Sequence, residues 1–209
     1  MLFTVAWVVS SLRQVGHSPA EVQLSGLAAE DARDPQVMMA GFVVLGAGTV
    51  LFGAGLGRVT VPRSASPWLV VVAGVASVAA GVFRRDHLLL AGPGFAGESW
   101  HNQVHDVVSG IAYGAMLAAP FLLGRGWRDN PDWAVLSRPV QVLALVSAAV
   151  LAVFVSGIAG PYNGVVQRIA VTLALTAEVL MAGRMLTVPV TCSAAGHHAQ
   201  LTSTNHPAD

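Results

Sequence analysis

Residues 140–158 of this chain read VQVLALVSAAVLAVFVSGI and contain no charged side chain. An α-helix rises about 1.5 Å per residue, so about 20 apolar residues are enough to cross the roughly 30 Å hydrocarbon core of a bilayer. The stretch has no glycine or proline before its end and is rich in Ala, Leu and Val. It therefore predicts a transmembrane helix.

Further apolar runs lie on both sides of this stretch, bounded by proline, glycine and charged residues. Pro67 and Pro139 precede two of the runs and predict helix starts there, because the first turn of a helix does not use the N–H that proline lacks. Leu2–Leu12 is apolar but only about half the spanning length, which predicts a short or truncated first helix. The other four runs are Val37–Leu56, Trp68–Phe83, Val107–Leu123 and Val165–Met185.

The composition agrees with a bilayer as the solvent. Hydrophobic residues make up 54% of the chain and charged residues 11%, a balance that the surface of a soluble domain does not tolerate. We therefore expect one all-α polytopic bundle of six transmembrane helices over residues 1–186, followed by a polar, disordered cytoplasmic tail over residues 187–209. The formal net charge is zero, so the basic face that nucleic-acid binding needs is not expected.

The basic residues bear on source and orientation. All of them are arginine, which is typical of a GC-rich genome and predicts the plasma membrane of a bacterium. Cytoplasmic loops carry an excess of basic residues, but here the two sides nearly tie, at six arginines against five. The side with six predicts that the loops after the second and fourth helices are cytoplasmic and that the opposite loops are extracytoplasmic. The six are Arg58, Arg63, Arg125, Arg128, Arg138 and Arg184, and the five are Arg13, Arg33, Arg84, Arg85 and Arg168.

Small residues recur at four-residue spacing, a pattern that lets helix backbones approach closely. Two interpretations fit it, a dimerisation face for a second copy or a membrane protein partner, and ordinary packing within the bundle. The stripes are Gly53 and Gly57; Ala73, Ser77 and Gly81; and Gly110, Gly114 and Ala118.

The densest polar cluster precedes the third long apolar run. If the helix there begins near Ser99, His101 and His105 lie at i and i+4 on one face and could share a divalent metal such as zinc. A catalytic zinc needs a third protein ligand and an open position for water. In the alternative interpretation the two imidazoles donate hydrogen bonds to loop carbonyls. The candidates for the third ligand or the catalytic carboxylate are Asp106, Asp86, Asp34 and Asp31.

Two further ionisable residues lie in or at the last apolar run. Glu178 is near its middle, where an ionised carboxylate facing lipid is costly, so it predicts a proton or cation site or a carboxyl bonded to a neighbouring hydroxyl. Arg168 lies just inside the start of the run and is typical of an interfacial anchor whose side chain reaches the headgroups. The hydroxyl residues that could accompany Glu178 are Ser147, Ser156, Thr172 and Thr176.

Four motifs in this order resemble those of the bacterial membrane family called domain of unknown function 998 (DUF998), over nearly the whole chain. The resemblance implies six helices and supplies no reaction. It also implies an acidic residue after the serine of the first loop, where this chain has Gly26, so that Glu30, Asp31 or Asp34 would have to substitute. The motifs are Leu24-Ser25-Gly26-Leu27 with Asp34-Pro35, Gly81-Val82-Phe83-Arg84-Arg85-Asp86, His101-x-x-x-His105-Asp106, and Gln167-Arg168.

Three functions are compatible with these residues. The favoured hypothesis is a non-catalytic membrane protein that binds lipid or a partner protein, because it needs the fewest assumptions. A metal-dependent hydrolase or lipid-modifying enzyme would use His101 and His105 with a nearby carboxylate. A small transporter would need Glu178 to line a water-accessible cavity.

Overall fold

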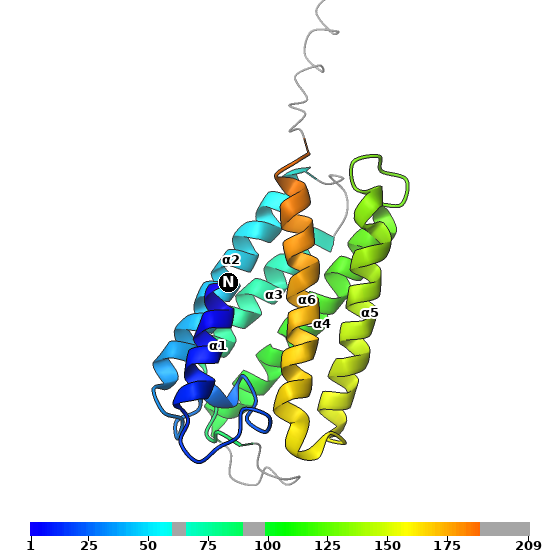
Figure 1. The fold of residues 1–209 in the computed structure, drawn as a ribbon. Coiled ribbons are helices and arrows are strands. Elements are labelled where there is room, and N and C mark those ends of the chain that lie inside the picture. The colour runs from blue at the N-terminus through cyan, green and yellow to red at the C-terminus, as the bar shows by residue number, and fades with distance from the viewer. Residues whose placement is uncertain (60–65, 90–98, 189–209) are drawn as a thin grey trace, which may run out of the picture.

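The computed structural model describes residues 1–59, 66–89 and 99–188, and this part of the chain folds as a helical bundle (Figure 1). Two single-turn 3₁₀ helices, η1 (Gly26–Ala28) and η2 (Gly160–Tyr162), lie in its loops. Arg63 and the polar tail beyond residue 188 lie outside the described residues. The α-helices are α1 (Leu2–Arg13), α2 (Pro35–Val59), α3 (Ser66–Val82), α4 (Trp100–Gly126), α5 (Ala134–Ser156) and α6 (Asn163–Met185).

The helix lengths confirm the predicted polytopic membrane bundle. Within the described residues, α2, α4, α5 and α6 are long and apolar enough to cross a bilayer. α3 has 17 residues and α1 has 12, so α1 is only about 18 Å long. It begins about halfway along the bundle and runs beside the first half of α2 (Figure 1). The short first helix expected from Leu2–Leu12 is therefore present.

Two predicted helix starts need comment. Pro67 is the second residue of α3, as expected, but Pro139 lies inside α5, so the prediction that it begins the helix is wrong. The reason is tertiary: Trp133 is buried in a stack with Trp127, their ring centroids 4.5 Å apart, and fixes the chain one and a half turns earlier. α4 begins at Trp100, seven residues before the apolar run, which bears out the start near Ser99 considered from the sequence; Ser99 caps the helix by accepting a hydrogen bond from the Asn102 N–H.

Small residues bring the helices together. Gly46 of α2 and Gly74 of α3 lie backbone to backbone, where a methyl group on either would collide with the other helix. Gly53 and Gly81 also contact the facing helix closely. For the two stripes that contain them, these contacts agree with ordinary packing within the bundle. Gly110 differs, because a methyl group there would meet no described atom.

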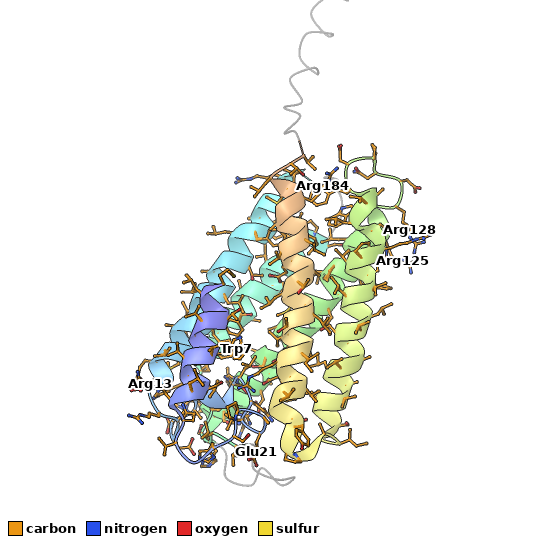
Figure 2. The ribbon with its side chains drawn as sticks, in the orientation of Figure 1. Trp7, Arg13, Glu21, Arg125, Arg128 and Arg184 are labelled. Carbon is orange, nitrogen blue, oxygen red and sulfur yellow. The ribbon has the colours of Figure 1, made fainter. Side chains whose placement is uncertain are left out.

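The bundle has two chemically different ends (Figure 2). We call one the cap end. It holds the loop from residue 14 to 34, residues 83–89, the start of α4 and the turn between α5 and α6; Arg13 and Glu21 are labelled there. The opposite end holds the loop between α4 and α5 and the last turn of α6, with Arg125, Arg128 and Arg184 labelled.

Candidate functional site

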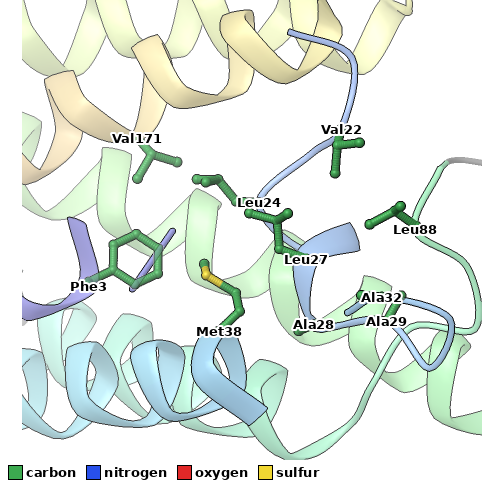
Figure 3. Packing of buried hydrophobic residues seen from close by; sticks show 10 residues of the cluster. All are labelled: Phe3, Val22, Leu24, Leu27, Ala28, Ala29, Ala32, Met38, Leu88 and Val171. Atoms are coloured by element: carbon green, nitrogen blue, oxygen red, sulfur yellow. The ribbon is translucent and has the colours of Figure 1, made fainter. Parts of the chain in front are cut away.

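The first loop folds back into the end of the bundle. Residues 22–29 are all buried, although only three of them belong to a helix. Leu24 and Leu27 point into a cluster with Phe3 of α1, Met38 of α2 and Val171 of α6 (Figure 3). We call residues 20–31 the cap, because they close this end of the bundle with apolar side chains.

Side chains at the start of α6 hydrogen-bond to the backbone of the cap. The Leu24 N–H donates to Oε1 of Gln167 at 2.7 Å, and Nε2 of Gln167 donates to the Tyr113 hydroxyl at 2.9 Å. Nη1 of Arg168 donates to the Val22 carbonyl at 2.7 Å. Gly164 completes this seam, since a side chain there would collide with the carbonyls of the cap. The adjacent Gln167-Arg168 pair therefore serves to anchor the loop.

Arg168 also reaches α1. Its Nη2 donates to the Ser11 hydroxyl at 3.0 Å, and its guanidinium lies 5.3 Å from the centre of the Trp7 ring. Protein groups therefore contact the Arg168 guanidinium directly. These contacts favour a structural role over the expected role as a headgroup anchor.

Residues 83–89 join the cap from the other side. The Glu30 N–H donates to the Arg85 carbonyl at 3.0 Å, and the Leu88 N–H donates to Oδ1 of Asp31 at 2.6 Å. Gly26 lies against the Leu88 carbonyl so closely that a Cβ would collide with it. The position after the loop serine has no room for a side chain in this arrangement.

Asp86 fixes the start of α4. Its carboxylate accepts from the Ser99 hydroxyl at 2.6 Å and from the Ser99 N–H at 2.7 Å. These bonds hold the pKa of Asp86 below its ordinary value, and the bond from the hydroxyl has the larger effect. Its backbone N–H donates to Oδ1 of Asn102, one turn into α4. Asp86 is therefore occupied as a structural acceptor.

A cavity of about 350 Å³ lies between the cap and the helices. Its wall contains both polar and apolar residues. The polar residues are Gln23, Ser25, Ser77, Arg85, His105, Asp106, Ser109, Tyr113 and Gln167. The larger apolar residues are Phe3, Leu24, Phe42, Leu45, Met116, Phe154, Val155 and Val171.

His105 is held rigidly in this wall. The side chain is 1% exposed, and Nδ1 lies 3.0 Å from the Ala80 carbonyl and 2.7 Å from the Phe83 carbonyl. Carbonyls only accept, so Nδ1 carries a hydrogen. Nε2 is buried and has no hydrogen-bond partner in the described residues.

Arg85 and Asp106 bring opposite charges to the cavity, and Arg85 is the more deeply buried of the two. Arg85 is 6% exposed, and its Nη2 is 3.8 Å from Oδ1 of Asp106, which is a loose ion pair. Its Nε has no hydrogen-bond partner in the described residues. A buried guanidinium needs its donors satisfied, so Arg85 and His105 leave polar capacity for a ligand in one cavity.

The predicted metal ligands are arranged differently from the expectation. His101 is exposed and stacks on Trp100 at 3.8 Å between ring centroids, whereas His105 turns inward. Asp106 pairs with Arg85, and Asp34 pairs with Arg13 at 2.7 Å. Among the described residues no three His, Cys, Asp or Glu side chains are grouped to hold a metal ion. The zinc site stays a prediction.

Glu178 lies apart from this cavity. Its Oε2 accepts from the Thr49 hydroxyl of α2 at 3.4 Å, which matches the interpretation of a carboxyl bonded to a neighbouring hydroxyl. Three of the hydroxyls named from the sequence bond to helix carbonyls instead: Ser147 to Ala170, Ser156 to Val153 and Thr176 to Thr172.

Comparison with known protein families identifies one that matches nearly the whole chain. The family described as "Protein of unknown function (DUF998)" matches residues 1–184. The chain belongs to the DUF998 family. No curated protein and no solved structure matches it.

In this DUF998 chain the acidic residues that could substitute for the missing loop acid make ion pairs or hydrogen bonds elsewhere. Glu30 lies 3.5 Å from Arg84, Asp31 accepts from Leu88, and Asp34 pairs with Arg13. None of the three lines the cavity.

Two residues of the DUF998 cavity were not singled out from the sequence. Ser109 and Tyr113 follow His105 at i+4 and i+8 on α4, so the three lie on one helix face. This stripe continues the polar first turns of α4 into its apolar part, which is a signal that could have found them.

Proposed function

We propose that this membrane protein binds an amphiphilic, lipid-like molecule with an anionic head in the cavity beneath the cap, without altering it chemically. The observation that carries the proposal is a buried guanidinium and a buried imidazole sharing one cavity with an apolar wall.

The polar part favours an anionic head. Arg85 has only a loose carboxylate partner, and its free Nε–H is a donor. An oxyanion of a carboxylate or phosphate accepts charge-assisted hydrogen bonds from a guanidinium, and such bonds are stronger than bonds between neutral groups. The Tyr113 hydroxyl, which accepts from Gln167, can donate to the same head.

The apolar part favours an acyl chain that enters from the side. Val155 of α5 lines the cavity and is 75% exposed, so the cavity reaches the flank of the bundle there. Gly110 of α4 also lines it and leaves the space beside the helix open. Figure 1 shows α4 moving away from α5 toward the cap end. A volume of about 350 Å³ holds a head and part of a chain, and the rest would lie in the bilayer.

The contacts of the two histidines favour binding over the hydrolase alternative. Two carbonyls fix the His105 ring, and His101 faces outward, so the pair does not present two nitrogens to one point.

A pair of glycine variants on α4 tests the proposal. Gly110→Leu fills the cavity, whereas Gly114→Leu adds the same side chain one turn along, at a residue that does not line it. A Cβ at either position meets no described atom within 4 Å, and leucine favours a helix over glycine by up to about 1 kcal/mol, so we expect both proteins to fold.

The readout is the thermal stability of detergent-purified protein with and without lysophosphatidylglycerol, with monoacylglycerol as the uncharged probe. A ligand at 100 times its Kd stabilises by about 2.7 kcal/mol, which raises Tm by several degrees. We expect this rise for the wild type and Gly114→Leu and none for Gly110→Leu. Arg85→Gln should abolish the preference for the anionic probe. An equal rise in both glycine variants would show that the cavity is not the binding site.

A further inference from the structure

The end of the bundle opposite the cap carries a second hollow, on the outside of α5. It is a groove of about 770 Å³ along the first three turns of that helix. Two arginines, Arg128 and Arg138, line it together with Ser137 and Gln141, and the remaining wall is apolar. It shares no residue with the cavity beneath the cap.

The arginines at the two ends differ in how they are used. Each of the five at the cap end is engaged by a protein group: Arg13, Arg33, Arg84 and Arg85 by carboxylates, and Arg168 by backbone carbonyls. At the opposite end Arg184 donates to the Asp132 carbonyl at 2.6 Å and Arg128 has only an amide partner. The other three, Arg58, Arg125 and Arg138, have no ion pair or hydrogen bond within the described residues. Free guanidinium groups at a membrane surface are therefore concentrated at the groove end.

The floor of the groove is rigid. Gln141 is 9% exposed, and its Nε2 donates to the Ser137 carbonyl at 2.7 Å. The Ser137 hydroxyl donates in turn to the Gly124 carbonyl of α4 at 2.7 Å. The remaining Oε1 of Gln141 accepts from Nη2 of Arg128 at 3.4 Å, which holds that guanidinium over the groove.

The rim of the groove is apolar and exposed. Val135, Val142 and Leu145 line it and are exposed on α5. Two carboxylates, Asp129 and Asp132, lie in the same loop, but neither is within ion-pair distance of Arg128 or Arg138 in the described residues. The groove thus joins uncompensated positive charge to an apolar strip that runs along the helix.

We infer that this groove binds the phosphate headgroup of an anionic diacyl phospholipid, with Arg128 and Arg138 as its ligands and an acyl chain along the apolar strip. Arginine is suited to phosphate because its planar donors can contact two oxygens together. The apolar strip favours a lipid over free phosphate. A basic residue near an anionic membrane surface contributes about 1 kcal/mol of attraction, so two make a selective site.

Native mass spectrometry of the detergent-purified full chain tests the inference, with phosphatidylglycerol against phosphatidylcholine. We expect Arg128→Gln/Arg138→Gln to lower the apparent affinity for phosphatidylglycerol about 30-fold, the equivalent of two contributions of about 1 kcal/mol, and to leave phosphatidylcholine unchanged. The matched control, Arg58→Gln/Arg125→Gln, removes the same charge from the same end outside the groove and should bind like the wild type.

Several results would overturn the inference: equal loss of binding in the control, unchanged binding in the groove variant, or full displacement of the lipid by inorganic phosphate. Arg138→Glu is the second variant, because it removes no hydrogen bond within the described residues and should fold even if the double variant does not. The Tm response to lysophosphatidylglycerol should persist in all these proteins, so this test and that of the cap cavity fail independently.

Discussion

Asp86 shows how one side chain at the cap end joins two segments. It accepts two bonds from Ser99, and Ser99 in turn caps α4. Because these bonds lower the pKa of Asp86 in the folded protein, the ionised carboxylate contributes stability at pH values above its ordinary pKa. That contribution falls as the pH drops below the ordinary value and is gone once the pH has passed the lowered one.

We expect Asp86→Asn to destabilise the protein by about 1 kcal/mol at pH 6, since a charge-assisted bond is replaced by a neutral one. The difference from the wild type should shrink by pH 3. Thermal unfolding in detergent at both pH values measures it, with Asp129→Asn in the opposite loop as the control. A difference that stays constant between the two pH values would show that ionisation of Asp86 does not contribute.

At the scale of the element, the cap depends on close backbone contact with α6. Gly164 lies against the carbonyls of Ala20 and Val22, so Gly164→Ala should push the cap outward at a cost of about 1–3 kcal/mol. Gly183→Ala lies in the same helix with no described atom near its added methyl group and should be neutral or stabilising by up to about 1 kcal/mol.

Limited proteolysis between residues 14 and 34, together with Tm, distinguishes these outcomes. Faster cleavage and a lower Tm in Gly164→Ala alone are the expected result. If both variants behave like the wild type, the seam between the cap and α6 does not stabilise the loop.

For the whole molecule, the charges at the two ends bear on orientation. Among the described residues the cap end holds five arginines against six carboxylates, whereas the opposite end holds five arginines against two. Membrane orientation follows basic residues rather than net charge, and the arginine counts of the two ends are equal, so the cap outside and the opposite end on the cytoplasmic side stay a prediction.

Labelling of single cysteines checks this orientation. In a Cys192→Ser background, a membrane-impermeant maleimide applied to intact cells should label His17→Cys at the cap end. It should label Asp129→Cys only after the cells are opened. The reverse pattern would invert the topology and place the proposed phospholipid groove on the outer leaflet.

The amino-acid sequence alone was enough to predict the membrane class, the helical bundle, the approximate spans and the family. Each follows from local properties: an uncharged apolar run such as residues 140–158 must be helical in lipid, because its backbone polar groups have no other partner there. It also marked Gln167, Arg168 and His105 as unusual residues. The position of Pro139 shows where such local rules fail, because the stack of Trp127 and Trp133 overrides the preference of proline for a helix start.

The grouping of the polar residues depends on how the chain packs in three dimensions. His101 and His105 share a helix face by spacing, yet one is exposed and the other is held by carbonyls of α3 and the residue after it. Arg85 and His105 line one cavity only because the cap packs beneath α6 and residues 83–89 fold against the cap. Contacts between residues far apart along the chain depend on packing and on loop geometry, which periodicity and composition do not encode.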